Sequence, residues 1–509
     1  MTRDYSTCLP YPVVNYDYMY LPNSSVVRFA LSVICILTVG LGALALETPV
    51  SGSLLRFRLS DRRTEVSSDF VRSVPAVQHQ AAENGAVALS YHLIDLCTIN
   101  TDPVTGQISS SPARINQSGV VAGTSRSGTS LHAARFTSGV VDDLGVIPGG
   151  LISSGVGIND SGVVTGDSEY SPDGGAIRHA TLFKNGTATD LGFLPQSGNY
   201  SRGTGVNNSE VVVGFSGFKL STSNTRAFIW DAANGMRDIG TLGGGWAKAF
   251  DINDANQVTG TSQVPTGLGA FQAFFWDEAN GMRPIPTIAG DSSSGNAINA
   301  NGHVVGTSTI NAFDNREHAF LWDGRTTWDL GALGGDDFYS DRSYGAGINI
   351  HDHVVGGTYR PYSGGALYAI PFLYRDGKMY DLSTLVDASG VDYRLGAATS
   401  INDAGQIAVN AVKISTNETR AVLLSPNVTL SGLVVTPQGR GLRNVAVTLT
   451  DPNGVRLVVM TSTLGFFQFE NMVAGQKYTV GAVSRRYRFA SRELDVTGSL
   501  TDMNLVGQE

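Results

Sequence analysis

The chain repeats one pattern seven times, and this repetition limits the possible folds more than any other feature. The clearest copy reads Ile158-Asn159-Asp160-Ser161-Gly162, and the shared asparagine recurs at Asn116, Asn159, Asn207, Asn253, Asn299, Asn349 and Asn402. Successive asparagines are 43, 48, 46, 46, 50 and 53 residues apart. A period of about 40 to 50 residues with four strand-like segments is typical of a propeller blade.

Each repeat predicts two hairpins. In the unit covering residues 226–260, a short apolar run is followed by turn-forming residues and an alternating segment, and a second pair of extended segments follows the glycines at 243–245. The second pair turns at Asn253-Asp254-Ala255-Asn256. Because Asn and Asp side chains hydrogen-bond nearby backbone and Gly or Asn accepts a positive φ, we interpret the repeated asparagine as structural rather than ligand-binding.

The two ends of the repeat region are incomplete in complementary ways. The first hairpin of each repeat has a first strand, such as 226–230, and a second strand, such as 236–240. The region opens at 91–97 with a second strand that has no first strand before it, and it ends at 420–424 with a first strand that has no second strand after it. If these strands pair, the ring closes and no sheet edge stays exposed. We therefore predict an all-β chain with a seven-bladed β-propeller over residues 91–425.

The repeats also resemble a known family. The rows His318-Ala319-Phe320-Leu321-Trp322 and Asp329-Leu330-Gly331 are similar to the bacterial extracellular HAF repeats, which are named for their His-Ala-Phe start. The resemblance covers nearly two thirds of the chain. It implies a secreted or surface location and supplies no residue roles.

Residues 427–509 lack the repeat and contain six short alternating segments, which predict a small β-sandwich. The runs Ser431-Gly432-Leu433-Val434 and Thr463-Leu464-Gly465-Phe466-Phe467 resemble carboxypeptidase regulatory-like domains, relatives of transthyretin-like and Cna-B-type modules. Some relatives of that fold bind carbohydrate, which the resemblance implies as an alternative function here.

The N-terminal part predicts export. Residues 29–46 contain an apolar stretch that follows Arg28 and ends at Ala43-Leu44-Ala45, and we interpret them as a signal peptide, with a single membrane anchor as the alternative. Residues 1–28 form a polar leader, which suggests a later start at Met19 or near Val26, and residues 47–90 form a linker. We expect a secreted or cell-surface protein.

Cleavage would leave Cys97 as the one cysteine of the mature chain, so no intramolecular disulfide could form. We interpret Cys97 as a small buried hydrophobic residue on a strand rather than a reactive thiol.

Charge and motifs exclude several function classes. A formal net charge of −9 and a pI near 5.4 argue against a nucleic-acid partner. The strings typical of zinc proteases, paired-cysteine zinc sites, P-loops and α/β-hydrolases do not occur. We predict no catalytic, cofactor-binding or metal-binding residues, and expect an unknown protein or glycan as partner.

A few short motifs and single residues suggest chemistry of their own. Gly166-Asp167-Ser168 looks like a nucleophile turn but occupies a repeated strand-end slot, and His351-Asp352-His353 could offer two imidazoles to a metal although it falls in a turn slot. His132, His179 and His318 share one slot, which indicates a common packing or hydrogen-bonding role. Trp230, Trp276 and Trp322 share another, where we expect them to fill the space between blades. Outside these slots, Trp246 and Trp328 are the candidate ligand contacts.

Three functions remain open. The first is a non-catalytic extracellular interaction scaffold. The second is carbohydrate binding through the C-terminal sandwich or the propeller aromatics. The third is a propeller hydrolase or lyase whose carboxylates break the repeat, with Asp336, Asp337 and Asp341 as the first suspects.

Overall fold

A computed structural model describes residues 89–509 except 101–105, 107, 138, 171–176, 196, 218–223, 266–269, 312, 314–315, 335–339 and 362–366. This part of the chain consists of β-strands with two short 3-10 helices, η1 (Leu382–Thr384) and η2 (Ala388–Gly390). Within it, no helix has the length and hydropathy that a membrane span requires. The leader 1–28, the apolar segment 29–46 and nearly all of the linker 47–90 lie outside the described residues.

Six antiparallel four-stranded sheets follow one another along the repeat region, each with its strands in chain order. The first three sheets are β2 (Ser110–Ile115), β3 (Val121–Ser127), β4 (Ser130–Thr137) and β5 (Val140–Asp143); β6 (Ser153–Ile158), β7 (Val164–Tyr170), β8 (Ile177–Lys184) and β9 (Thr187–Asp190); β10 (Tyr200–Val206), β11 (Val212–Gly217), β12 (Arg226–Asp231) and β13 (Gly235–Asp238).

The next three sheets have the same order and connectivity. They are β14 (Ala247–Ile252), β15 (Val258–Gln263), β16 (Phe271–Asp277) and β17 (Gly281–Pro284); β18 (Ser293–Ile298), β19 (Val304–Thr309), β20 (Glu317–Trp322) and β21 (Thr327–Asp329); β22 (Ser343–Ile348), β23 (Val354–Pro361), β24 (Leu367–Arg375) and β25 (Lys378–Asp381).

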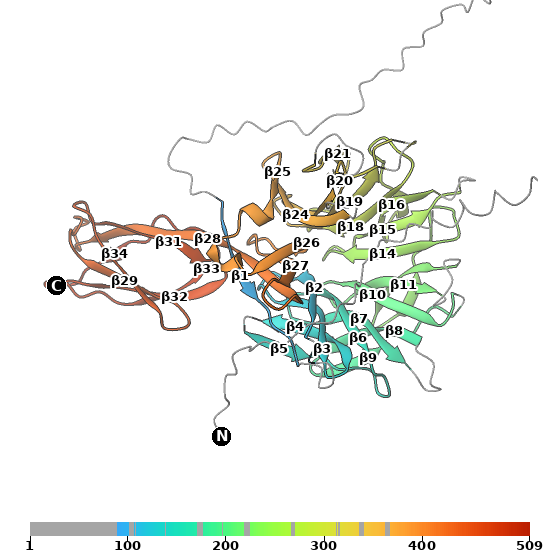
Figure 1. Ribbon diagram of the computed structural model, residues 1–509, viewed down its shortest axis with the longest axis horizontal. Helices are drawn as coiled ribbons and strands as arrows, with labels where there is room; N and C mark the ends of the chain where they lie inside the picture. The colour runs from blue at the N-terminus through green and yellow to red at the C-terminus, as the bar shows by residue number, and fades with distance from the viewer. Residues whose placement is uncertain are drawn as a thin grey trace, which may run out of the picture. The chain divides into compact units, whose positions relative to one another are not determined.

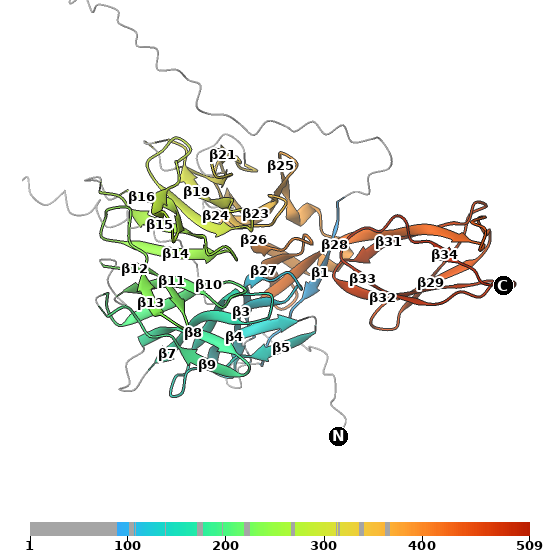
Figure 2. The same cartoon turned by 180° about the vertical axis from the view of Figure 1, so that it is seen from behind.

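The seventh sheet joins the two ends of the repeat region. Its strands β26 (Tyr393–Ile401), β27 (Ile407–Lys413) and β28 (Glu418–Val435) come from the end, and β1 (Tyr91–Asp95) comes from the beginning. In Figures 1 and 2 the blue β1 lies beside the orange β28. The pairing is antiparallel, with Leu93 opposite Leu424. This sheet also contacts the first one, since β26, β27 and β28 all lie against β2.

Apolar side chains between neighbouring sheets form the core of the repeat region. Phe228, Phe274, Phe320 and Phe372 are fully buried at equivalent places on the third strands, and each packs with residues of the preceding sheet. Each ring also lies over a glycine of its own second strand: a β-carbon built on Gly260 would stand 2.8 Å from the ring of Phe274. The recurring Val-x-Gly of these strands therefore follows from the aromatic residue opposite.

The predicted inter-sheet role of the repeated tryptophans is confirmed. Trp276 is buried in a cluster with Val213, Ala227 and Ile229 of the preceding sheet, and Trp322 packs onto the cluster around Phe275. Trp230 packs in the same way against Leu182 and Leu191.

Residues 427–509 build a further all-β part. The four-stranded sheet has the order β30 (Arg456–Met460), β29 (Ala446–Thr450), β32 (Gln476–Val483) and β33 (Arg492–Val496). The second half of β28 pairs with β31 (Phe466–Val473) and with β34 (Leu505–Val506). One hydrophobic cluster joins the two groups of strands, with Leu430, Val447, Phe467 and Val480 buried in it.

Two details differ from the sequence-based expectations. The expected domain boundary at residue 426 falls inside the continuous strand β28. The first half of β28 pairs with β1 and β27, and the second half pairs with β31. Between the two halves, the carbonyl of Pro426 accepts a hydrogen bond from the backbone N–H of Ala474. Cys97 follows β1 rather than lying on a strand, and it is half-buried with φ +65°. Its backbone N–H donates to Asp95, so this residue belongs to a turn.

Candidate functional site

The seven repeated asparagines form a closed circuit. The Nδ2 of each donates to the backbone carbonyl of the next asparagine, at 2.9 to 3.1 Å, and Asn402 donates back to Asn116. Each Oδ1 accepts the backbone N–H four residues on in its own turn, at 2.9 to 3.0 Å. All seven side chains are buried. The structural interpretation of these residues is therefore confirmed, and their amides are occupied rather than available to a ligand.

One layer inside this circuit, two charged residues meet across the ring. The residues two positions before the asparagines are Arg114, Gly157, Gly205, Asp251, Ala297, Gly347 and Ser400. Arg114, on the first sheet, donates from Nη1 to Asp251 on the fourth at 3.0 Å and from Nη2 to the carbonyl of Asn296 on the fifth at 2.9 Å. Five small residues leave room for this contact, and a β-carbon on Gly205 would approach the Cα of Asp251 to 3.2 Å. The Arg114–Asp251 pair therefore occupies the centre of the ring at this level.

In the second, third and fourth sheets, two arginines contact one carboxylate and a lysine lies beside one of them. Asp167 of β7 is fully buried, and its oxygens lie 2.8 Å from Nη1 of Arg178 and 3.3 Å from Nε of Arg202. Lys248 of β14 stands over the ring of Phe215, which pairs with Arg202 across the strands. Burial, and to a lesser extent the charge of Arg202, lower the pKa of Lys248. The register position that Arg202 and Lys248 share is uncharged in the first, second, fifth and sixth sheets.

Aromatic rings surround the ammonium of Lys248. Its Nζ lies 4.5 Å from the ring centre of Phe215 and 5.1 Å from that of Trp246. Trp246 in turn meets Phe271 edge-on, with ring centres 5.0 Å apart. We call Arg178, Arg202, Lys248, Phe215 and Trp246 the basic and aromatic cluster. Half-buried cations beside half-exposed aromatic faces can bind a ligand by charge and by stacking.

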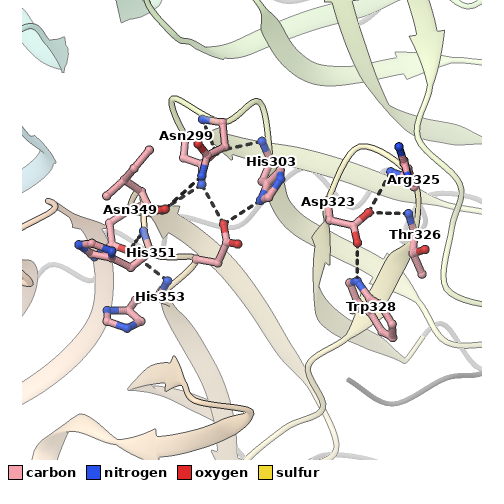
Figure 3. Close-up of polar contacts among 12 residues, drawn as sticks. Asn299, His303, Asp323, Arg325, Thr326, Trp328, Asn349, His351 and His353 are labelled. Atoms are coloured by element: carbon pink, nitrogen blue, oxygen red, sulfur yellow. Dashed lines mark hydrogen bonds and ion pairs between the residues drawn. The ribbon is translucent and has the colours of Figure 1, made fainter. Parts of the chain in front are cut away.

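The two tryptophans predicted as ligand contacts have different surroundings. Trp246 belongs to the basic and aromatic cluster. Trp328 is on the outermost strand β21, where its Nε1 donates to Asp323 at 3.0 Å and its ring packs against the core cluster around Leu321. Figure 3 shows this contact together with the bonds from Arg325 and Thr326 to the same carboxylate. Arg237 and Arg283 make the equivalent contact to an aspartate in the two preceding sheets, so Trp328 holds a hairpin together.

The triplet His351-Asp352-His353 serves the asparagine circuit. The backbone N–H groups of His351 and His353 donate to Asn349, while Asp352 accepts from Asn299 and from Nδ1 of His303 (Figure 3). Burial lowers the pKa of His353 to about 4. In the described residues no group of three or more His, Cys, Asp or Glu side chains is placed to hold a metal ion.

The repeated histidines share one hydrogen bond, as predicted. Nδ1 of His132, His179 and His318 lies 2.8 to 3.0 Å from the aspartate eleven residues on. Asp341, one of the carboxylates suspected of catalysis, pairs with Arg316 and His318 and so has structural partners, whereas Asp336 and Asp337 lie outside the described residues. Ser168 is buried and accepts from the backbone of Ile147, in agreement with a strand-end role.

Sequence reasoning missed most of the basic and aromatic cluster. Arg202 and Lys248 stand five residues before their asparagines, where four of the other five sheets have Ser111, Ser154, Ser294 and Tyr344. The sequence signal that could have revealed the cluster is a charged residue at this same position in two adjacent repeats. Asp167 was named only as part of a strand end, because its partners come from positions 11 and 35 residues away in the sequence.

The chain is thus an all-β protein of propeller-like architecture, made of small four-stranded sheets whose most distinctive polar group is the basic and aromatic cluster. A family model described as "Protein of unknown function (DUF3466)" matches residues 150–458, more than half of the sequence, and the chain belongs to this family. No curated protein matches it.

Solved structures show only distant likeness. TolB from Acinetobacter baumannii is 11% identical with a TM-score of 0.31, over 47% of this chain and 62% of TolB. An acylaminoacyl peptidase from Pyrococcus horikoshii is 10% identical with a TM-score of 0.25, over 78% of this chain and 54% of the peptidase. The function therefore has to be argued from the site itself.

Proposed function

We propose that the chain is a secreted or surface-located, non-catalytic binding protein, with a seven-bladed β-propeller over residues 91–425 followed by a β-sandwich over 427–509. Six four-stranded sheets, a seventh sheet in which β1 pairs with β28, and the circuit of seven asparagines support the propeller. The similarity to HAF repeats and to carboxypeptidase regulatory-like domains agrees with an extracellular location. The export segment would lie within residues 29–46.

The ligand that the geometry favours is carbohydrate, bound at the basic and aromatic cluster. The observation that carries this proposal is Lys248, a half-buried cation whose ammonium lies over the rings of Phe215 and Trp246, at a position where three other repeats have serine. Aromatic faces beside a few polar groups are the usual composition of a small-ligand site, and residues that depart from a repeat are where function is expected.

A broad glycan array tests this function, with the purified chain compared against two tryptophan variants. We expect saturable binding that Trp246→Ala abolishes and that Trp328→Ala leaves unchanged, because Trp328 is occupied by Asp323. Near-ultraviolet circular dichroism would verify that both variants stay folded. Equal loss in both variants, or binding that neither variant alters, would rule out Trp246 as a ligand contact.

A protein-interaction scaffold is the second candidate. The edge strand β30 of the C-terminal part exposes Leu457, Val458 and Met460, which are 49%, 56% and 58% accessible. Exposed apolar residues on a sheet edge favour contact with another protein chain. Silence of the whole glycan array would make this scaffold the better explanation.

A further inference from the structure

The basic and aromatic cluster contains more positive than negative charge. Arg178 and Arg202 both contact the carboxylate of Asp167, and Lys248 stands over the ring of Phe215, the residue that pairs with Arg202 across the strands. Among the described residues no carboxylate pairs with Lys248. The chain as a whole has a formal net charge of −9, so a local excess of positive charge on adjacent inner strands runs against its general composition.

The position of Lys248 makes this charge costly unless something neutralises it. Burial and the nearby guanidinium of Arg202 lower the pKa of the Lys248 ammonium. The rings of Phe215 and Trp246 compensate only in part, since a cation–π contact is weaker than a charge-assisted hydrogen bond to an anion. An anion bound between Lys248 and Arg202 would remove the like-charge repulsion between them.

The cluster does not belong to the general plan of the repeat. At the same register position the first, second and fifth sheets carry Ser111, Ser154 and Ser294, and these sheets fold with the same strand order. Folding of a sheet of this type therefore does not require a lysine or an arginine at this place. Arg202 is paired with Asp167, whereas the charge of Lys248 calls for a separate explanation.

We propose that Lys248 and Arg202 form the anion-binding part of the carbohydrate site, so that its ligand is an acidic saccharide. The carboxylate or sulfate of the sugar would lie against these two cations, and the apolar face of the sugar ring would lie against Trp246. This inference rests on the carbohydrate-binding function proposed above and specifies its ligand class.

Calorimetric titration of the purified chain tests the inference with three acidic probes: trigalacturonate, a hyaluronan tetrasaccharide and a chondroitin sulfate tetrasaccharide. Fully methyl-esterified trigalacturonate serves as the uncharged match. We expect at least one acidic probe to bind, at least about tenfold more tightly than uncharged sugars, and to weaken as salt is added. Lys248→Met should reduce that affinity about tenfold while Lys248→Arg retains most of it.

A matched control is available in the same chain. Lys378 also stands over an aromatic ring, with Nζ 4.8 Å from the ring centre of Tyr380, but it is exposed on another sheet. Lys378→Met should leave saccharide affinity unchanged, and unfolding curves would show that the variants at 248 remain native.

The outcomes separate this inference from the broader function. Binding of neutral glycans that Trp246→Ala abolishes, without preference for acidic probes or effect of Lys248→Met, would overturn the acidic ligand and leave the carbohydrate function standing. Absence of binding to any glycan would overturn both.

Discussion

The guanidinium of Arg114 lies 3.0 Å from the carboxylate of Asp251, which is 137 residues further along the chain. The two side chains are 19% and 15% exposed, so both are largely withdrawn from water. Asp251 also accepts the backbone N–H of Ile298 at 3.0 Å. Through this ion pair and its hydrogen bonds, the first sheet is joined to the fourth and fifth sheets, which do not follow it directly along the chain.

Removing one partner of this pair should strongly destabilise the fold. We expect Arg114→Met to lower the free energy of unfolding by about 3 kcal/mol, because it leaves the carboxylate of Asp251 buried without its cation. The double variant Arg114→Met with Asp251→Asn should regain more than half of that loss, since the asparagine is uncharged and can still accept from Ile298. Urea denaturation measures both.

The control for this experiment is Arg237→Met. Arg237 pairs with Asp231 in an exposed hairpin, and exposed pairs of this kind contribute at most about 1 kcal/mol. If Arg114→Met and Arg237→Met cause equally small changes, the central pair does not connect the sheets energetically.

The asparagine circuit predicts that replacing one of its amides by a carboxylate lowers the stability of the fold. Asn159→Asp keeps the oxygen that accepts from Val163 but loses the donor to the carbonyl of Asn207, and it places a negative charge beside that carbonyl. We expect a loss of about 1 to 3 kcal/mol in the free energy of unfolding, typical of a buried unsatisfied polar group. Thermal denaturation should show it.

An exposed asparagine provides the comparison. Asn185 stands in a hairpin turn with φ +51°, and Asn185→Asp should change stability by less than about 0.5 kcal/mol. A similar small effect at both positions would mean that the bonds between successive asparagines add little to stability.

Much of the architecture could be predicted because it is local and repeated. The turn at Asn159 depends on residues within four positions, and the same rule applies in every repeat. The pairing of residues 91–95 with 422–426 was also readable from the phase of the repeats. In contrast, the position two residues before the asparagine is an arginine in one repeat alone and an aspartate in one other, and the spacing of the repeats does not indicate that Arg114 and Asp251 meet. The same holds for Asp167 with Arg202, because closure of a ring brings together residues that no period relates.

Cys97 occupies a backbone position that favours glycine. Four repeats read Asp-Leu-Gly or Asp-Ile-Gly there, and those glycines have positive φ, from +71° to +88°: Gly145, Gly192, Gly240 and Gly331. Cys97 adopts φ +65° after the same Asp-Leu pair. A side chain in this region is strained by about 1 to 2 kcal/mol, while glycine adds some unfolded-state entropy, so we expect Cys97→Gly to stabilise by about 0.5 to 1 kcal/mol.

The reciprocal substitution tests the same reasoning. A β-carbon on Gly145 would meet no atom within 4 Å, so Gly145→Ala changes only the backbone preference. It should destabilise by about 1 kcal/mol in the same denaturation experiment. Destabilisation by Cys97→Gly would show instead that the thiol contact to the carbonyl of Asp95 outweighs the backbone strain.

The repeated histidine–aspartate bonds predict how stability depends on pH. The hydrogen bond that His132 donates to the carboxylate of Asp143 raises the pKa of His132 above 6.5. Burial lowers the pKa of His318, but Asp329 and Asp341 outweigh it and raise the value overall. Charged histidine is therefore favoured in the folded state. This contribution is complete below pH 6.5 and is lost as the pH rises through the raised folded-state pKa values.

The aspartates act in the opposite direction on the acid side. Burial raises the pKa of Asp143, yet the hydrogen bonds from His132, Ser127 and Gly145 outweigh it and lower the value below 3.8. Its contribution is present above pH 3.8 and is lost as the pH falls through the lowered value. For these groups together, stability should be greatest between about pH 4 and pH 6.5.

Melting temperatures measured from pH 4 to pH 8 check this profile. The double variant His132→Gln with His318→Gln should lose much of the decline that the unmodified chain shows above pH 6.5, because glutamine does not titrate. His351→Gln, which removes an exposed histidine outside the slot, should keep that decline. An unchanged slope in the double variant would mean that these two histidines do not bind protons more tightly in the folded state than in the unfolded one.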